Sequence, residues 1–394
     1  MQRDTVQRRP LIQVHNGSPK RLRVAVVTES FLPTGNSVTT SVCRTLEHLS
    51  RRGHDAVVIC PGPAPDSFAG APVIGVPSIS YRHSPIGLPS SKVMRTLASF
   101  APDVVHLASP MVLGSVGVTA AGQLGVPSVA VFQSDATGFI RRHRAGLLHG
   151  AAWRWLRQVH EQADLTLATS AAGWAELRSH SVPRLALWQG GVDVERFSPR
   201  RRNTPAVAEL RARLAPNGET LIGYLGTLTA QQQIERLGAL AGLPNVRIVV
   251  AGTGPASQSL PPAGVIFLGS LDGDELANAY AALDLFLQLD DVPAGDDAAE
   301  EPLLAAMASG VPVVAADLGR RSELVAHGLN GLLYSPGDDA ARRGAVASLA
   351  ADRDQRRWMG QAARVGVERR TAEQLGDALI GHYRAVLRQR SVAA

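Results

Sequence analysis

Apolar runs alternate with amphipathic stretches along the first half of the chain. Residues 23–30 predict a buried strand, because an uninterrupted apolar run ends there in polar residues. Residues 42–54 predict a helix, since Val42, Leu46 and Leu49 fall on one face and Gly53 marks the end. The alternation continues through residues 55–62, 102–109, 127–135, 151–163 and 164–170. This order of strands and helices predicts a doubly wound parallel sheet.

A polar segment at residues 190–209 interrupts the alternation and predicts a domain boundary. A second series of strands and helices follows over residues 220–338, and a last helix at 371–390 is long enough to cross back over the first domain. The predicted fold class is therefore α/β, with two Rossmann-like doubly wound domains that face a cleft. The expected units are a flexible lead-in at 1–20, an acceptor domain at 21–199, a nucleotide-sugar domain at 200–374 and a returning helix at 375–394.

Composition narrows the class of protein. The chain is 45% hydrophobic but only 5% aromatic, which suits α/β cores built from Ala, Val and Leu. The net charge is +6, yet the arginines are scattered and no aromatic-interleaved basic motif appears, so nucleic-acid binding is not expected. No window approaches the ~20 apolar residues of a membrane span, and the polar lead-in lacks a signal core. We expect a cytoplasmic protein with reduced Cys43 and Cys60, and leave homo-oligomerisation and peripheral membrane contact open.

Several motifs resemble one enzyme family. They are VAVVTESFLPTGNSVTTSV, APDVVHLASP, AAWRWLRQVHEQADLTLATS, GVDVERFSP, GYLGTL, AMASGVPVVA and NGLLYSPGD, spread over about residues 22–340. Together they resemble the two-domain (GT-B) glycosyltransferases of family 4, most closely the actinobacterial α-mannosyltransferases that use nucleotide-diphosphate mannose. The resemblance implies a retaining transferase that needs no cofactor and no metal. Its co-substrate would be a nucleotide-diphosphate sugar, with a GDP sugar favoured over a UDP sugar.

The resemblance also implies where the donor binds. The glycines of VAGTGP form a tight loop after a strand, where a nucleotide would lie close to the backbone. The other donor contacts are carried over from matching family motifs. The expected donor residues outside the acidic stretch are Gly35, Asn36, Ser37, Gly226, Thr227, Gln232, Gly252, Gly254, Gly269, Ser270 and Leu271.

Five of the matched positions depart from the family pattern. The family carries an Arg and a Lys at the positions of Thr227 and Gln232, and each lost charge-assisted contact is worth roughly 1.5–3 kcal/mol. The two family glutamates correspond to Asp297 and Ala305. The aspartate keeps a carboxylate for the donor sugar, whereas the alanine cannot accept a hydrogen bond from the ribose. At Ser37, a β-carbon replaces a family glycine beside the phosphates.

An acidic stretch precedes a helix that we expect to begin at Pro302 and to end at Gly310. The acids could cap this helix in solvent, recognise a cationic substrate such as an amino sugar or a quaternary ammonium, or bind a metal. A carboxylate ~5 Å from a phosphate would repel it by roughly 3 kcal/mol at an effective dielectric of 20. The carboxylates are those of Asp290, Asp291, Asp296, Asp297, Glu300 and Glu301, of which Asp297, Glu300 and Glu301 are candidate site residues.

Further candidates lie in loops. Asp135 follows a strand and could orient or deprotonate an acceptor, or simply form a turn. One arginine cluster could hold an acceptor phosphate or a lipid head group, and another could replace the missing diphosphate contacts, although either could be surface charge. These arginines are Arg141, Arg142 and Arg144, and Arg320 and Arg321.

Three functions remain open. The first is a retaining glycosyltransferase that moves a sugar from a nucleotide-diphosphate donor to a small or lipid-linked acceptor. Its altered donor positions favour an atypical enzyme of specialised metabolism, for example one that glycosylates sulfur or oxygen of a cationic acceptor. The second is a catalytically degenerate homologue that acts as a partner or regulator of an active transferase. The third is a lectin-like or nucleotide-sensing module that uses the same cleft.

Overall fold

The computed structural model describes residues 21–81, 84–108, 110–132, 146–226, 228, 234–254, 263–289 and 296–393. Within these residues, ten strands precede residue 190: β1 Arg23–Thr28, β2 Asp55–Pro61, β3 Ser67–Phe68, β4 Ala71–Val76, β5 Ser78–Tyr81, β6 Ser84–Gly87, β7 Val104–Ala108, β8 Ser128–Phe132, β9 Leu165–Ala168 and β10 Leu185–Leu187. Six follow: β11 Thr220–Leu225, β12 Val246–Ala251, β13 Val265–Phe267, β14 Leu285–Leu287, β15 Val313–Ala316 and β16 Gly331–Tyr334.

Helices connect these strands. The first half contains α1 Ser37–Arg51, α2 Ser91–Phe100, α3 Val112–Leu124, α5 Gly146–Gln162 and α6 Ala171–Ser179. The second half contains α7 Pro205–Leu214, α8 Gly238–Ala241, α9 Gly273–Ala282, α10 Asp296–Ala308, α11 Arg320–Leu324, α12 Asp339–Ala351, α13 Arg353–Val367 and α14 Ala372–Ala393, with short 3-10 turns at Pro199–Asn203 and Ile234–Leu237. Among the described residues, no helix is long and apolar enough to cross a bilayer.

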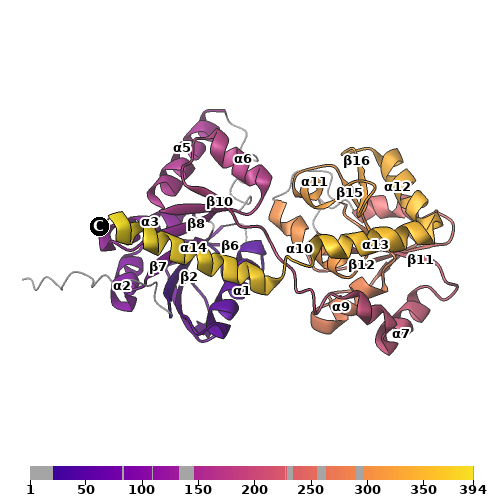
Figure 1. The fold of residues 1–394 in the computed structure, drawn as a ribbon, viewed down its shortest axis with the longest axis horizontal. Helices are drawn as coiled ribbons and strands as arrows, with labels where there is room; N and C mark the ends of the chain where they lie inside the picture. Colours follow the sequence, from indigo (N-terminus) through magenta and orange to yellow (C-terminus); the bar gives the residue numbers. More distant parts are fainter. Residues whose placement is uncertain are drawn as a thin grey trace, which may run out of the picture.

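The strands form two large sheets that lie in separate halves of the molecule (Figure 1). The first has eight strands in the order β10-β9-β8-β7-β1-β2-β4-β3, and the second has six in the order β13-β12-β11-β14-β15-β16. Every pair in these two sheets is parallel except β3–β4, and the separate pair β5–β6 is antiparallel. The predicted fold class of two doubly wound α/β domains is confirmed.

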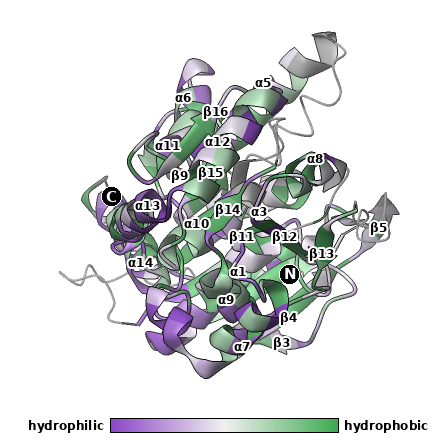
Figure 2. Ribbon diagram, turned by 90° about the vertical axis from the view of Figure 1, so that its right-hand side faces the viewer, coloured by the Kyte–Doolittle hydropathy of each residue, from purple (hydrophilic) through white to green (hydrophobic). Residues whose placement is uncertain are grey.

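The centre of each sheet is apolar on both faces. The Val24–Val27 segment of β1 is fully buried, as are Leu221 and Ile222 of β11. Figure 2 shows hydrophobic residues on the central strands and hydrophilic residues on peripheral helices such as α7 and α13. Because helices cover both faces of a parallel sheet, the strands of the sheet carry uninterrupted apolar runs. Such runs in the sequence predicted these strands.

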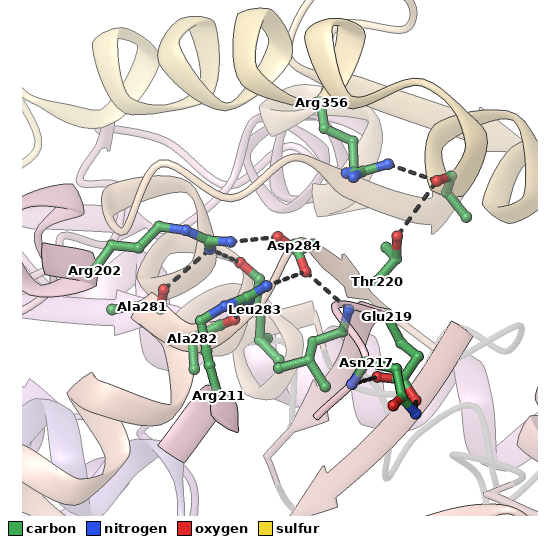
Figure 3. A network of polar contacts seen from close by, with 12 residues as sticks. Arg202, Arg211, Asn217, Glu219, Thr220, Ala281, Ala282, Leu283, Asp284 and Arg356 are labelled. Carbon is green, nitrogen blue, oxygen red and sulfur yellow. Dashed lines mark hydrogen bonds and ion pairs between the residues drawn. The ribbon is translucent and has the colours of Figure 1, made fainter. Parts of the chain in front are cut away.

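A partly buried carboxylate ties the segment after residue 199 to the second sheet (Figure 3). Asp284, immediately before β14, pairs with Arg202 and accepts hydrogen bonds from Arg211 Nη2 at 3.1 Å and from the backbone nitrogen of Leu221 at 2.9 Å. Arg202 also donates to the carbonyl oxygens of Ala281 and Leu283, at 3.2 and 2.5 Å. This network fixes the 3-10 turn and α7 against α9 and β11, because several charged groups satisfy one another where solvent is scarce.

The last helix returns to the first domain. Helix α14 lies along that domain in Figure 1, where Leu379, Ile380 and Val386 join the hydrophobic core built on β1 and α1. The buried hydroxyl of Tyr383 lies 2.8 Å from Nδ1 of His106 on β7. Burial lowers the pKa of His106 to about 4, so this hydrogen bond is made by a neutral imidazole at pH 7.

A carboxyl group links the loop after β1 to the start of α3. Oε1 of Glu29 accepts hydrogen bonds from the backbone nitrogens of Met111 and Gly114, at 3.0 and 2.8 Å. Burial raises the pKa of Glu29 to about 7, although these backbone donors act in the opposite direction. The carboxyl group therefore titrates near neutral pH and makes the stability of the first domain depend on pH.

The Glu29→Gln variant tests this dependence. Because the folded-state pKa lies above the ordinary 4.5, the stabilisation by the protonated form is complete below pH 4.5 and is lost as pH rises through 7. We expect the free energy of unfolding of the wild type to fall by roughly 3 kcal/mol relative to the variant across that window. Urea unfolding between pH 4.5 and 7.5 measures it; parallel curves for the two proteins would contradict the assignment.

Candidate active site

A cavity of about 380 Å³ lies between the two domains, at the carboxyl ends of both sheets. The first domain contributes the loop before α1, and the second contributes the loops after β11, β12 and β13 together with α9 and α10. The structure thus brings together many of the donor residues expected from sequence, namely Gly35, Asn36, Ser37, Gly226, Gly252, Ser270, Leu271, Glu301 and Ala305.

The N-terminus of α1 faces this cavity. Asn36 caps the helix by accepting a hydrogen bond from the backbone nitrogen of Thr39 at 2.9 Å, and its Nδ2 donates to Ser30 Oγ at 2.8 Å. Both the oxygen and the nitrogen of the Asn36 side-chain amide are therefore hydrogen-bonded, which holds the cap in place. Because Gly35, Asn36 and Ser37 line the cavity, the positive end of the α1 dipole favours a negatively charged ligand there.

Two glycines keep the loops of the second domain close together. Gly252 has φ +145°, and a β-carbon there would lie 1.8 Å from the carbonyl oxygen of Gly226. A β-carbon on Gly254, at φ +148°, would lie 2.1 Å from the oxygen of Leu228. The tight loop predicted from VAGTGP is thus required by the neighbouring loop of the protein itself. Gly254 and Gly269 adjoin the cavity residues, since Gly252 donates to the Gly269 oxygen at 2.8 Å.

Helix α10 begins earlier than predicted. It starts at Asp296, so Pro302 lies inside it rather than at its first position. Acidic residues in the first turns are stabilised by the helix dipole, which offsets the one backbone donor that the proline lacks. Glu300 and Glu301 are consequently part of the helix, and Asp297 is its second residue.

The two adjacent glutamates of α10 point to different places. Glu300 is buried and packs against Gly190, where a β-carbon would lie 2.6 Å from its Oε1. Glu301 lines the cavity, remains half-exposed and forms an ion pair with Arg44 of α1. Ala305 follows one turn later and is buried in the cavity wall, where it presents a methyl group. The cavity wall formed by α10 is therefore acidic at one turn and apolar at the next.

Aromatic residues close the cavity on the side of α9. The hydroxyl group of Tyr280 donates to the carbonyl oxygen of Leu225 at 3.1 Å, and its ring meets Phe197 edge to face at 5.5 Å. Burial, with a smaller contribution from Glu301, raises the pKa of Tyr280 well above its ordinary value. The phenol group of Tyr280 therefore stays neutral, and its hydrogen-bonded side chain forms part of the cavity wall.

The other expected residues fall elsewhere. Arg321 is buried on α11, donates from Nε to Leu318 O at 3.3 Å, and does not line this cavity. Arg320 begins α11 and Asp297 lies in α10, but the description of these two covers the backbone only. Outside the described residues lie Asp135, Arg141, Arg142, Arg144, Thr227 and Gln232. The described residues also contain no cluster of three metal-ligating side chains.

Sequence reasoning named Ser37 but missed the rest of the face of α1 that turns toward the second domain, namely Thr40, Ser41 and Arg44. Ser37, Thr40, Ser41 and Arg44 recur at helical spacing and line cavities between the domains. The signal was present, because these polar positions share a face away from the apolar positions used to predict the helix. A few polar side chains on one helix face are equally typical of a face exposed to solvent. Without knowledge of the second domain that packs opposite, the sequence did not distinguish the two cases.

Known proteins show the same architecture. Residues 38–196 match the model of Glycosyltransferase Family 4, and residues 219–352 match that of Glycosyl transferases group 1. GDP-mannose-dependent alpha-mannosyltransferases from Mycolicibacterium smegmatis and Mycobacterium tuberculosis are 42% and 40% identical, covering 95% of this chain and 100% and 99% of theirs. The crystal structure of Anabaena Alr3699/HepE in complex with UDP superposes with a TM-score of 0.74 at 18% identity, over 92% of this chain and 99% of that one.

Two facing doubly wound domains with a cavity at their strand ends define a protein of the GT-B glycosyltransferase fold. The matches extend from the first domain through the second and cover nearly the whole chain. The chain belongs to glycosyltransferase family 4, as its motifs predicted.

The Gly252→Ala variant tests the packing of the cavity floor. Its β-carbon must displace the backbone of Gly226, so we expect a loss of more than about 3 kcal/mol in the free energy of unfolding, measured by urea denaturation. Gly269→Ala is the matched control. It has φ +77° but open space around the new β-carbon, and should lose only about 1–2 kcal/mol. Equal losses would show that backbone conformation alone matters at Gly252.

Proposed function

We propose that the protein transfers mannose, with retention of configuration, from GDP-mannose to a small or lipid-linked acceptor. The observation that carries this proposal is the interdomain cavity, where loops of both domains meet at the carboxyl ends of their sheets. Relatives that are 42% and 40% identical are named GDP-mannose-dependent alpha-mannosyltransferases, which supports both the base and the sugar. Within this proposal, residues 21–199 carry the acceptor and residues 200–374 the donor.

The cavity suggests an orientation for the donor. Ser270 and Leu271 would contact the base, in keeping with the family resemblance. The diphosphate would lie between Gly226 and the N-terminus of α1, whose dipole favours anions. The sugar would then approach the first turn of α10, and Asp297, the second residue of that helix, is proposed to act on it. Asp135 is proposed to orient or deprotonate the acceptor.

Donor binding should be weaker than in a family member with the full set of contacts. Thr227 and Gln232 provide no charge for the diphosphate, and Ala305 provides no acceptor for a ribose hydroxyl. Each such loss is worth about 1–3 kcal/mol. The half-exposed carboxylate of Glu301 adds repulsion, unless a cation neutralises it.

A second candidate is a degenerate homologue that regulates or partners an active transferase. The specific observation in its favour is the apolar surface of Ala305 beside the acidic Glu301 in the donor cavity. The same acidity is compatible with an atypical transferase of specialised metabolism that takes a cationic acceptor. Nucleotide binding separates the candidates, because the degenerate homologue needs no donor.

Calorimetric titration with GDP, GDP-mannose and UDP tests the proposed function. We expect micromolar dissociation constants for GDP and GDP-mannose and weaker binding of UDP. Release of GDP from GDP-mannose on addition of a mannosyl acceptor extract would then establish transfer. A folded protein that binds none of the three ligands would exclude the transferase and favour the degenerate homologue.

Restoring the two family cations should strengthen donor binding. The double variant Thr227→Arg with Gln232→Lys should bind GDP about tenfold tighter or more, because each charge-assisted contact to phosphate exceeds 1 kcal/mol. Titration of both proteins with GDP measures the change. As a control, Thr119→Arg with Gln123→Lys adds the same charge on α3, outside the donor cavity. Equal gains in GDP affinity in both double variants would show that the effect comes from net charge alone.

A further inference from the structure

A second cavity, of about 110 Å³, adjoins the donor cavity between the domains. It is enclosed by α1, the connecting segment 188–191, α10 and the start of α14, and it shares Ser37, Thr40 and Glu301 with the donor cavity. Among the described residues that line the two cavities, Arg44 is the only arginine or lysine. It is therefore the one permanent positive charge that these residues place beside the proposed donor site.

Arg44 stands on a polar stripe that leads to the donor cavity. Ser37, Thr40, Ser41 and Arg44 follow the spacing of one helix face, and the first two reach both cavities. Side chains on a helix lean toward its N-terminus, which for Arg44 is the direction of Ser37. Its partner in the structure is Glu301, on the wall of the donor cavity.

The ion pair between Arg44 and Glu301 is open to exchange. The two side chains are 43% and 50% exposed, and ion pairs this exposed contribute little to stability. A diphosphate carries more charge than one carboxylate, and its oxygens accept two parallel hydrogen bonds from a guanidinium. Thr227 and Gln232 carry no charge where the family has cations, and none of the described second-domain residues that line the donor cavity is an arginine or a lysine.

We propose that Arg44 binds the donor diphosphate by exchanging Glu301 for it. This inference rests on the proposed function. It assigns the binding of the donor diphosphate to a positive charge of the first domain. Glu301 holds the guanidinium beside the cavity in the absence of donor and loses this partner when the donor binds. Because Arg44 belongs to one domain and the base site to the other, donor binding requires both domains in their present juxtaposition.

Other contacts keep the domains together when Arg44 leaves Glu301. Glu323 of α11 accepts hydrogen bonds from the backbone nitrogens of Ala171 and Ala172, at 3.2 and 3.0 Å, at the start of α6. By contrast, the ion pair of Arg52, just after α1, with Asp377 of α14 lies within the first domain, on which α14 packs. The exchange is therefore a local movement of one side chain and does not open the cleft.

Titration with GDP and with guanosine tests the proposal in three variants. Arg44→Gln should weaken GDP binding about tenfold or more, while guanosine binding is unchanged because it has no phosphate. Glu301→Gln should tighten GDP binding several-fold, because it frees the arginine and removes a repelling charge. Arg52→Gln is the matched control: it removes an arginine of the same helix and another ion pair to the C-terminal half, and should leave GDP affinity unchanged.

The directions of the changes in GDP affinity distinguish a contact with the ligand from an ion pair that only holds the domains together. If Arg44 and Glu301 only hold the domains together, both substitutions break the same pair and shift GDP affinity in the same direction. That result, or equal losses of GDP and guanosine binding in Arg44→Gln, would overturn the proposal while leaving the transferase intact. Failure of the wild type to bind GDP would instead reject the proposed function, and this inference with it.

Discussion

The relative placement of the two domains depends on a pair of chain segments that cross together between them. Val192 donates from its backbone nitrogen to the oxygen of Arg370 at 2.8 Å, and the indole of Trp188 donates to the oxygen of Leu375 at 3.1 Å. A β-carbon on Gly191 would lie 2.8 Å from the same Arg370 oxygen. The outgoing and returning segments can thus lie this close only because no side chain separates them.

Helix α14 makes this crossing stable. Its apolar face completes the hydrophobic core of the first domain, so the returning segment cannot detach without exposing Leu379, Ile380 and Tyr383. The cavity between the domains is consequently held by hydrophobic packing within the first domain. Loops at its edge are free to vary in charge.

The charge distribution of the cleft follows from this freedom of the loops to vary in charge. The N-terminus of α1 lines the larger cavity from the first domain and Arg44 lines the adjoining smaller one, while the carboxylate of Glu301 lines both from the second domain. Family members place their cations on the second domain, by the resemblance of the loop at Thr227 and Gln232. In this chain the described positive charge lies on the opposite side, so the same anionic donor would be bound from the other domain.

The sequence by itself determined both sheets. The run at residues 23–30 contains the central strand β1, because a parallel sheet covered on both faces favours apolar side chains. Family motifs also predicted eight of the residues that line the larger interdomain cavity. The start of α10 could not be read correctly, because the stabilisation of its acidic first turns competes with Pro302 and only the folded helix shows the balance. The ion pair of Arg44 with Glu301, far apart in the chain, and the backbone contact that requires Gly252 arose only from tertiary structure, since local patterns carry no information on which distant groups meet.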